Sequence, residues 1–308
     1  MIRYKKIVAV VNYTESSRRA LLKAQKLANK EDAKMVVVHC INNSGIEELR
    51  KHHDIDMSLL LSRERKNLGG YISDVLGSFE GVEHHVFEGE PFADVIAYCE
   101  GNDVDLLVIG SNEYEEEHSK NGIFSIKCVR RASMPVLLVK NVAGHTHKKV
   151  IVYTDLSDIS STLIAHAAKQ SLDNDDELDV VNFIHPPWLK FDHMLYNLTT
   201  VEDEDYKVQY KNLAQSQLQS KIKRATEYLP ITINPVVIVA ENTISQMMNY
   251  LNEHDADMVV IGKTGEGWYR SKHPLGTTAE HVLRQADCSV LIIPVPEEFD
   301  AHLNVLKK

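Results

Sequence analysis

The sequence of 308 residues is poor in the residues that mark several classes of protein. With only 14 glycines, 9 prolines and 4 cysteines, it is neither collagen-like nor a disulfide-stabilised scaffold. The cysteines lie far apart and form no Cys-x-x-Cys pair, so the sequence predicts neither a zinc site nor a redox pair. Hydrophobic residues at 44% and charged residues at 25% are ordinary values for a globular protein, which excludes a disordered chain.

Long hydrophobic runs are also missing. The first run, Ile7–Val11, is too short for the core of a signal peptide, and no later run approaches the roughly 18 residues that a membrane span needs. The net charge of -10 disfavours binding to nucleic acids and anionic membranes, because both would repel the protein. We therefore expect a cytoplasmic protein with reduced thiols and with neither nucleic acid nor membrane as a partner.

The chain repeats itself. Residues 5–12 match residues 148–155, residues 104–110 match residues 256–262, and residues 134–139 match residues 288–293, always in the same order. The offset between matching segments grows along the chain, so the second copy carries insertions. A repeat of about 150 residues is a whole domain, since solenoid repeats are much shorter. The sequence thus predicts domains at residues 1–142 and 147–296, joined by a short linker and followed by a tail at 297–308.

Strand and helix patterns alternate in both copies. The predicted strands lie near residues 6–11, 35–40, 82–88, 105–109 and 136–139, and near 149–154, 178–184, 231–239, 257–261 and 289–293. Most are continuous runs rich in Val and Ile, as in parallel strands buried on both faces. The segments between them have apolar residues at helical spacing. These patterns predict an α/β fold of two tandem, doubly wound parallel sheets with five strands each, a Rossmann-like architecture.

Two helix predictions are specific. Pro91 suits the first turn of a helix whose inward residues would be Ala93, Ile96 and Ala97. In the second copy, Thr243 is expected to cap the helix that follows it.

Candidate ligand-binding residues follow the ends of two strands in the second copy. Ligands of open parallel sheets bind at the carboxyl ends of the strands, where the strand order reverses. Asp155 ends the first strand, and Gly262 ends the fourth and begins a Gly-x-x-Gly segment. Further on, Gly276 and two threonines precede a helix, whose start could present backbone N–H groups to a phosphate. Lys263 adds a positive charge, as do Arg270 and Lys272. On spacing alone, an ordinary loop with a threonine helix cap remains the alternative.

This pattern resembles the universal stress protein family over both halves of the chain. The resemblance implies an adenine nucleotide alpha hydrolase-like fold, pairing of domains through their last strands within the chain or in a homodimer, and binding of ATP or AMP, with Mg²⁺ as a candidate companion. Family members bind through Gly-x-x-Gly, nine residues and Gly-Ser/Thr, whereas ten residues separate Gly265 from Gly276 here. It also implies that Thr154 and Asp155 lie near base and ribose, and Phe183 beside the adenine. The candidate nucleotide-binding residues are Thr154, Asp155, Phe183, Gly262, Lys263, Gly265, Gly276, Thr277 and Thr278.

The first copy departs from this pattern. Asn12 stands in place of Asp155, the second glycine after Gly110 is missing, and no hydroxyl follows Gly122. Four carboxylates occupy the loop where phosphates would lie, from Glu113, Glu115, Glu116 and Glu117. Because like charges repel, we expect this copy to bind no ATP and to serve as a structural half.

Three functions are open at this stage. The first is a non-enzymatic stress-response protein that binds an adenine nucleotide in its C-terminal domain. The second is a nucleotide-free scaffold that binds partners through surfaces such as residues 185–205. The third is an enzyme of a related adenine-nucleotide fold that performs adenylyl transfer or slow ATP hydrolysis, the latter with a metal ion at Asp155. The sequence has no Gly-x-x-x-x-Gly-Lys-Ser/Thr loop and no recognisable nucleophile–base pair, so we predict no catalytic residues and favour the first function.

Overall fold

The computed structural model describes residues 2–43, 46–47, 56–77, 81–111, 124–140, 149–172, 177–185, 204–227, 229–265 and 275–295. The chain divides into two compact units. One comprises Arg3–Asn141, and the other comprises Val142–Lys308 together with Met1–Ile2. The predicted linker and the predicted tail lie outside the described residues.

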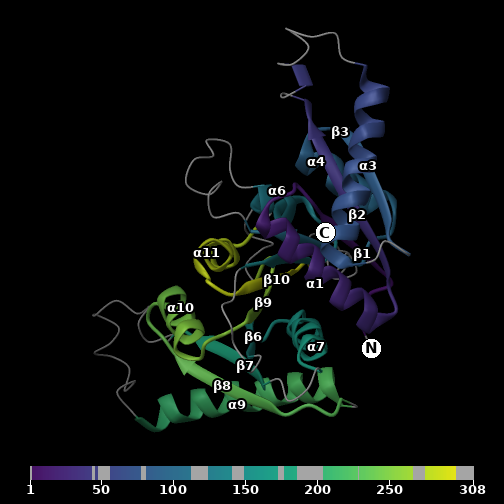
Figure 1. Ribbon diagram of the computed structural model, residues 1–308. Coiled ribbons are helices and arrows are strands. Elements are labelled where there is room, and N and C mark those ends of the chain that lie inside the picture. Colours follow the sequence, from purple (N-terminus) through teal and green to yellow (C-terminus); the bar gives the residue numbers. More distant parts are fainter. Residues whose placement is uncertain are drawn as a thin grey trace, which may run out of the picture. The chain divides into compact units, whose positions relative to one another are not determined.

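The N-terminal unit contains a five-stranded parallel sheet with the order β3-β2-β1-β4-β5. Its strands are β1 (Lys6–Val10), β2 (Lys34–Asn42), β3 (Glu83–Gly89), β4 (Leu106–Gly110) and β5 (Val136–Val139). Its helices are α1 (Glu15–Glu31), α3 (Met57–Leu76), α4 (Pro91–Gly101) and α6 (Phe124–Arg131). Helices α1 and α3 cover one face of this sheet and α4 and α6 the other (Figure 1).

The C-terminal unit repeats the same topology, with the order β10-β9-β6-β7-β8 and parallel pairing throughout. Its strands are β6 (Lys149–Thr154), β7 (Glu177–Ile184), β8 (Ile233–Val239), β9 (Met258–Gly262) and β10 (Ser289–Ile293). Its helices are α7 (Ser160–Gln170), α9 (Glu204–Thr226), α10 (Thr243–Glu253) and α11 (Thr277–Gln285). Helices α7 and α9 pack together on one face, and α10 and α11 on the other.

These sheets confirm the predicted fold class. All ten predicted strands are present, with ends that differ by at most two residues from the sequence prediction. Strands β1, β4, β6 and β9 are almost wholly buried, which is why their sequences are continuous apolar runs. In each unit the first strand pairs with the fourth, β1 with β4 and β6 with β9, so the strand order reverses between them. This reversal is the switch point at which ligands of such sheets bind.

Both specific helix predictions need correction. Pro91 lies in the first turn of α4 and Ile96 is buried, as predicted, but the other buried residues are Val95 and Cys99, whereas Ala93 is half-buried and Ala97 is exposed. The larger side chains decide which side of α4 packs on the sheet, because they bury more apolar area. The cap of α10 is Asn242 rather than Thr243, since the Asn242 side chain accepts the hydrogen bond from Ser245 N at 3.1 Å.

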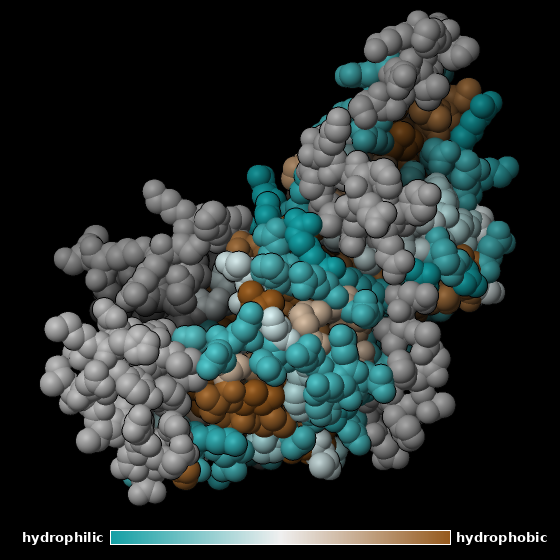
Figure 2. Space-filling model, turned by 90° about the vertical axis from the view of Figure 1, so that its left-hand side faces the viewer, coloured by the Kyte–Doolittle hydropathy of each residue, from teal (hydrophilic) through white to brown (hydrophobic). Residues whose placement is uncertain are grey.

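Apolar side chains also reach the surface of the C-terminal unit. On α9, Ala214 and Leu218 are buried, whereas Val208 and Leu213 are 54% and 56% exposed. Figure 2 shows hydrophobic residues gathered in one area of this unit, among largely hydrophilic neighbours. No helix in the described part of the chain is long and apolar enough to cross a membrane.

Candidate functional site

A pocket of about 400 Å³ lies at the carboxyl ends of β6, β7 and β9 in the C-terminal unit. All nine residues predicted from the sequence line it: Thr154, Asp155, Phe183, Gly262, Lys263, Gly265, Gly276, Thr277 and Thr278. The sequence did not predict the other lining residues, which are Tyr153, Ile159, Leu163, Thr243, Met247, Ile261, Thr264 and Ala279. The pocket forms because β6 and β9 are neighbours while the helices that follow them cover opposite faces of the sheet.

The loop between β6 and α7 fixes Asp155 at the mouth of the pocket. Its Oδ1 accepts a hydrogen bond from Ser157 N at 3.1 Å, and Thr154 Oγ1 accepts one from Leu156 N at 3.1 Å. Leu156 has a φ of 63°, in the left-handed region, which turns the chain sharply after the strand. From the neighbouring strand, Asn182 Nδ2 donates to the carbonyl of Thr154 at 2.8 Å. These contacts fix the turn that carries Asp155, and the hydrogen bond from Ser157 N orients its carboxylate.

Two glycine-containing segments form the opposite wall. A Cβ atom at Gly265 would lie 3.0 Å from Asp155 Oδ2, so this glycine lets the loop and the carboxylate approach each other. The two segments are joined by a hydrogen bond from Gly276 N to the carbonyl of Lys263, at 2.9 Å. Gly276 also precedes α11 without any side-chain cap. The start of α11 therefore faces the pocket with backbone N–H groups and the positive end of the helix dipole.

An aromatic group forms the apolar wall. The ring of Phe183 lies edge-on to Tyr153, with centroids 5.3 Å apart and planes at 76°, and to Tyr250, at 6.5 Å and 88°. Tyr153 OH donates to the carbonyl of Met247 at 2.5 Å. Burial raises the pKa of Tyr153 far above its usual value, so this hydroxyl remains a donor. A flat apolar wall opposite phosphate-binding groups suits an aromatic base joined to an anionic tail.

The corresponding edge of the N-terminal unit has the same turn after its first strand but lacks the negative charge of Asp155. Asn12 Oδ1 accepts from Thr14 N at 3.4 Å, as Asp155 does from Ser157, and Tyr13 has a φ of 62°. A Cβ atom at Gly110 would collide with the backbone carbonyl of Ser16, at the start of α1. At Gly262 in the other unit, the corresponding Cβ would lie 3.6 Å from a side-chain carbon of Leu163 in α7. In the N-terminal unit, helix backbone thus packs directly on the end of the fourth strand.

Several predicted features lie outside the described residues. They are the acidic cluster at Glu113–Glu117, Gly122, Arg270, Lys272 and residues 186–203 of the insertion. Within the described residues, no three His, Cys, Asp or Glu side chains gather in a way that could hold a metal ion.

Fold and pocket define a protein of two doubly wound α/β domains, one of which has a polar and aromatic pocket at the switch point of its sheet. The universal stress protein family matches the chain twice, over residues 3–140 and 146–294, and the chain belongs to that family as a tandem two-domain member.

The similar proteins agree with this assignment. A universal stress protein of Methanocaldococcus jannaschii is 27% identical over 159 residues, which cover 49% of this chain and 85% of that protein. The solved structure of a universal stress protein from Archaeoglobus fulgidus is 15% identical with a TM-score of 0.63, covering 95% of this chain and 99% of that one. A functionally unknown protein from Pseudomonas aeruginosa is 17% identical with a TM-score of 0.62, covering 98% and 96%. The solved structures share the fold.

Proposed function

We propose that this stress protein binds an adenine nucleotide, ATP or AMP, in the pocket of its C-terminal domain, and that it acts by binding rather than by catalysis. The observation that carries the proposal is the convergence of residues from distant parts of the sequence on one pocket. Its volume of about 400 Å³ lies within the range of small-molecule sites, roughly 300–1,000 Å³.

Each part of the pocket fits one part of the nucleotide. The adenine would lie against Phe183, and the phosphates against the Gly262–Gly265 segment and the start of α11. Thr277 and Thr278 would donate hydroxyl hydrogen bonds to the phosphates, and Lys263 would supply positive charge. Asp155 would accept hydrogen bonds from the ribose hydroxyls.

A magnesium ion fits the same arrangement. Mg²⁺ in nucleotide sites is commonly held by one or two carboxylates together with phosphate oxygens. Asp155 Oδ2, beside Gly265, is a carboxylate oxygen on the phosphate side of the pocket. A bound ion would neutralise the repulsion between this carboxylate and the phosphates.

The N-terminal domain is proposed to be a structural half that binds no nucleotide. The backbone of α1 packs on Gly110, and Asn12 lacks the charge of Asp155. Pairing of the domains, within the chain or in a homodimer, remains a prediction from the family resemblance. The cytoplasmic location remains a prediction from the short hydrophobic runs and the separated cysteines of the sequence.

The test is mass spectrometry of nucleotide released from the purified full-length protein, with calorimetric titration of ATP. We expect ATP or AMP to be released or ATP to bind, and Gly276→Asp to abolish binding because its carboxylate faces the phosphates. The sequence-equivalent Gly122→Asp in the N-terminal domain should leave the affinity unchanged. If the wild-type protein neither retains nucleotide nor gives heat with ATP, the proposal is wrong and the scaffold function is favoured. Phosphate release that disappears in Asp155→Ala would instead favour a slow ATPase.

A further inference from the structure

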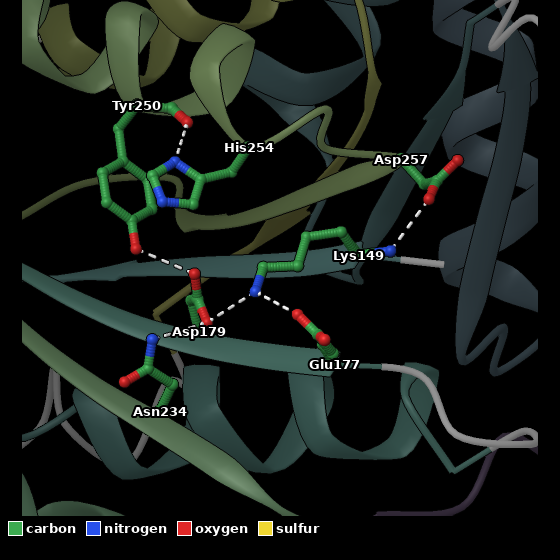
Figure 3. A network of polar contacts seen from close by, with 7 residues as sticks. All are labelled: Lys149, Glu177, Asp179, Asn234, Tyr250, His254 and Asp257. Atoms are coloured by element: carbon green, nitrogen blue, oxygen red, sulfur yellow. Dashed lines mark hydrogen bonds and ion pairs between the residues drawn. The ribbon is translucent and has the colours of Figure 1, made fainter. Parts of the chain in front are cut away.

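A buried carboxylate lies in the C-terminal sheet, outside the pocket. Asp179, near the start of β7, is 0% exposed and stands between the buried apolar residues Leu178 and Val180. Its Oδ1 lies 2.9 Å from Lys149 Nζ and accepts a hydrogen bond from Asn234 Nδ2 at 3.1 Å, while Oδ2 accepts one from Tyr250 OH at 2.8 Å (Figure 3). A buried ion pair seldom stabilises a fold more than apolar residues would. Its presence therefore suggests a role other than stability.

Lys149 compensates the charge of Asp179. Its Nζ also donates to Glu177 Oε2 at 2.7 Å, and its backbone N donates to Asp257 Oδ2 at 2.8 Å. Although burial lowers the pKa of Lys149, its hydrogen bonds to Glu177 and Asp179 outweigh this effect and raise the pKa above its usual value. The lysine therefore stays charged and compensates the carboxylate of Asp179, which accepts the hydrogen bond from Tyr250.

Tyr250 connects this carboxylate to the wall of the pocket. Asp179 and Phe183 point to the same face of β7, because alternate residues of a strand share a face. Tyr250, on α10, meets both of them, with its hydroxyl on Asp179 and its ring edge-on to Phe183. Tyr250 is also held by His254. The two rings stack with their centroids 4.0 Å apart, and His254 Nδ1 lies 3.0 Å from the backbone carbonyl of Tyr250. Phe183 is thus held by two tyrosines, Tyr153 and Tyr250, and each hydroxyl has a fixed acceptor.

The N-terminal domain provides an internal comparison. Tyr98 corresponds to Tyr250, since each lies seven residues before the aspartate that precedes the fourth strand. By strand register, however, Val36 replaces Asp179 and Cys40 replaces Phe183. The acid and the phenylalanine at these two positions therefore occur together in the domain that has the glycine segments, whereas the other domain has Val36 and Cys40 there.

We propose that Asp179 and Tyr250 are positioning residues that hold Phe183 in the orientation in which it contacts the nucleotide base. This inference rests on the nucleotide site proposed above. It adds that Tyr250 connects Asp179, near the amino end of β7, to the base-binding residue Phe183 near the carboxyl end. A preorganised wall raises affinity because binding need not order the side chain first. Loss of the hydroxyl of Tyr250 would loosen the Phe183 ring and weaken contact with the base.

The test is a double-mutant cycle in the full-length protein, with the affinity for ATP measured by calorimetry. Tyr250→Phe removes one hydroxyl and keeps the ring, and we expect the Kd to rise about three- to tenfold. Phe183→Leu should raise the Kd as well. If Tyr250 acts through Phe183, adding Tyr250→Phe to Phe183→Leu should change the Kd little further, whereas a general loosening of the domain would make the two effects multiply. Tyr98→Phe, the matched control in the N-terminal domain, should leave the Kd unchanged.

The outcomes separate this inference from the function on which it rests. If the wild-type protein does not bind ATP, both proposals fail. If it binds ATP and Tyr250→Phe binds equally well, or if the two substitutions act independently in the cycle, the positioning role is wrong and the nucleotide site stands. A Kd that rises in Tyr250→Phe, stays the same in Tyr98→Phe and changes little further in the double variant supports it.

Discussion

Replacement of Gly110 by alanine is expected to destabilise the N-terminal domain strongly, and the same change at Gly262 to affect the C-terminal domain much less. The added Cβ at Gly110 would collide with the carbonyl of Ser16 and lie 2.8 Å from Ser17 N. Both contacts are with backbone at the start of α1, which cannot move aside as a side chain could. At Gly262 the nearest atom would be the carbonyl oxygen of Thr264, at 3.2 Å.

The magnitudes follow from these distances. Overpacking by one methyl group typically destabilises a protein by about 1–3 kcal/mol, and the collision at Gly110 places that substitution near about 3 kcal/mol. The contact at Gly262 corresponds to the lower end, about 1 kcal/mol. For a domain of this size, a loss of about 3 kcal/mol lowers the melting temperature by roughly 10 °C.

Urea denaturation can assign each loss to a domain. Both tryptophans, Trp188 and Trp268, lie in the C-terminal half of the sequence, so tryptophan fluorescence follows that domain, whereas far-ultraviolet circular dichroism follows both. Gly110→Ala should separate the urea transition seen by circular dichroism from the one seen by fluorescence. Gly262→Ala should shift both transitions slightly. Equal losses in the two variants would refute the argument that α1 backbone packs more tightly on the fourth strand than α7 does.

Three further predictions concern single side chains. Asp155→Asn keeps the side-chain oxygen that accepts the hydrogen bond from Ser157 N and removes the charge, so the affinity for ATP should fall about tenfold, as for the loss of a charged hydrogen bond. The control variant Asn12→Asp should leave the Kd for ATP unchanged. An unchanged Kd in Asp155→Asn would argue against contact of Asp155 with the ribose or a metal ion. Gly265→Ala should weaken ATP binding, because its Cβ would lie 3.0 Å from Asp155 Oδ2, and a wild-type Kd would show that this approach is unimportant. Burial, and then the nearby Lys169, lower the pKa of His166 from 6.5 to about 4, so stability that is present above pH 6.5 should be lost as the pH falls toward 4, by about 3 kcal/mol. In His166→Gln, urea midpoints measured over this range should show a smaller loss than in the wild type, and an identical pH dependence would contradict this reasoning.

The strands and the glycine segments could be predicted from the sequence because each depends on local patterns. Parallel strands buried on both faces need continuous apolar residues, which is why even their ends were predicted to within two residues. The orientation of α4 could not be predicted in the same way. Its alanines fit a helical stripe, but Val95, Ile96 and Cys99 fit another, and the choice depends on the sheet beneath.

The aromatic part of the site depends on contacts between distant residues. Phe183 was predicted through the family resemblance, whereas Tyr153, Tyr250 and Met247 were not assigned to the site. Their roles follow from the packing of α10 on β7, which brings Tyr250 to Asp179 across 71 residues of sequence. One signal was available, since an aspartate inside the predicted strand at residues 178–184 is unusual for a strand buried on both faces.

The central claim is that two copies of one domain have diverged, so that only the C-terminal copy binds a nucleotide. Calorimetric titration of the nucleotide-free full-length protein with ATP measures this directly as a stoichiometry. The account predicts one ATP per chain, with binding lost in Gly276→Asp. A stoichiometry of two would show that the N-terminal domain also binds, and the absence of binding would show that the pocket at the end of β6 and β9 is not a nucleotide site.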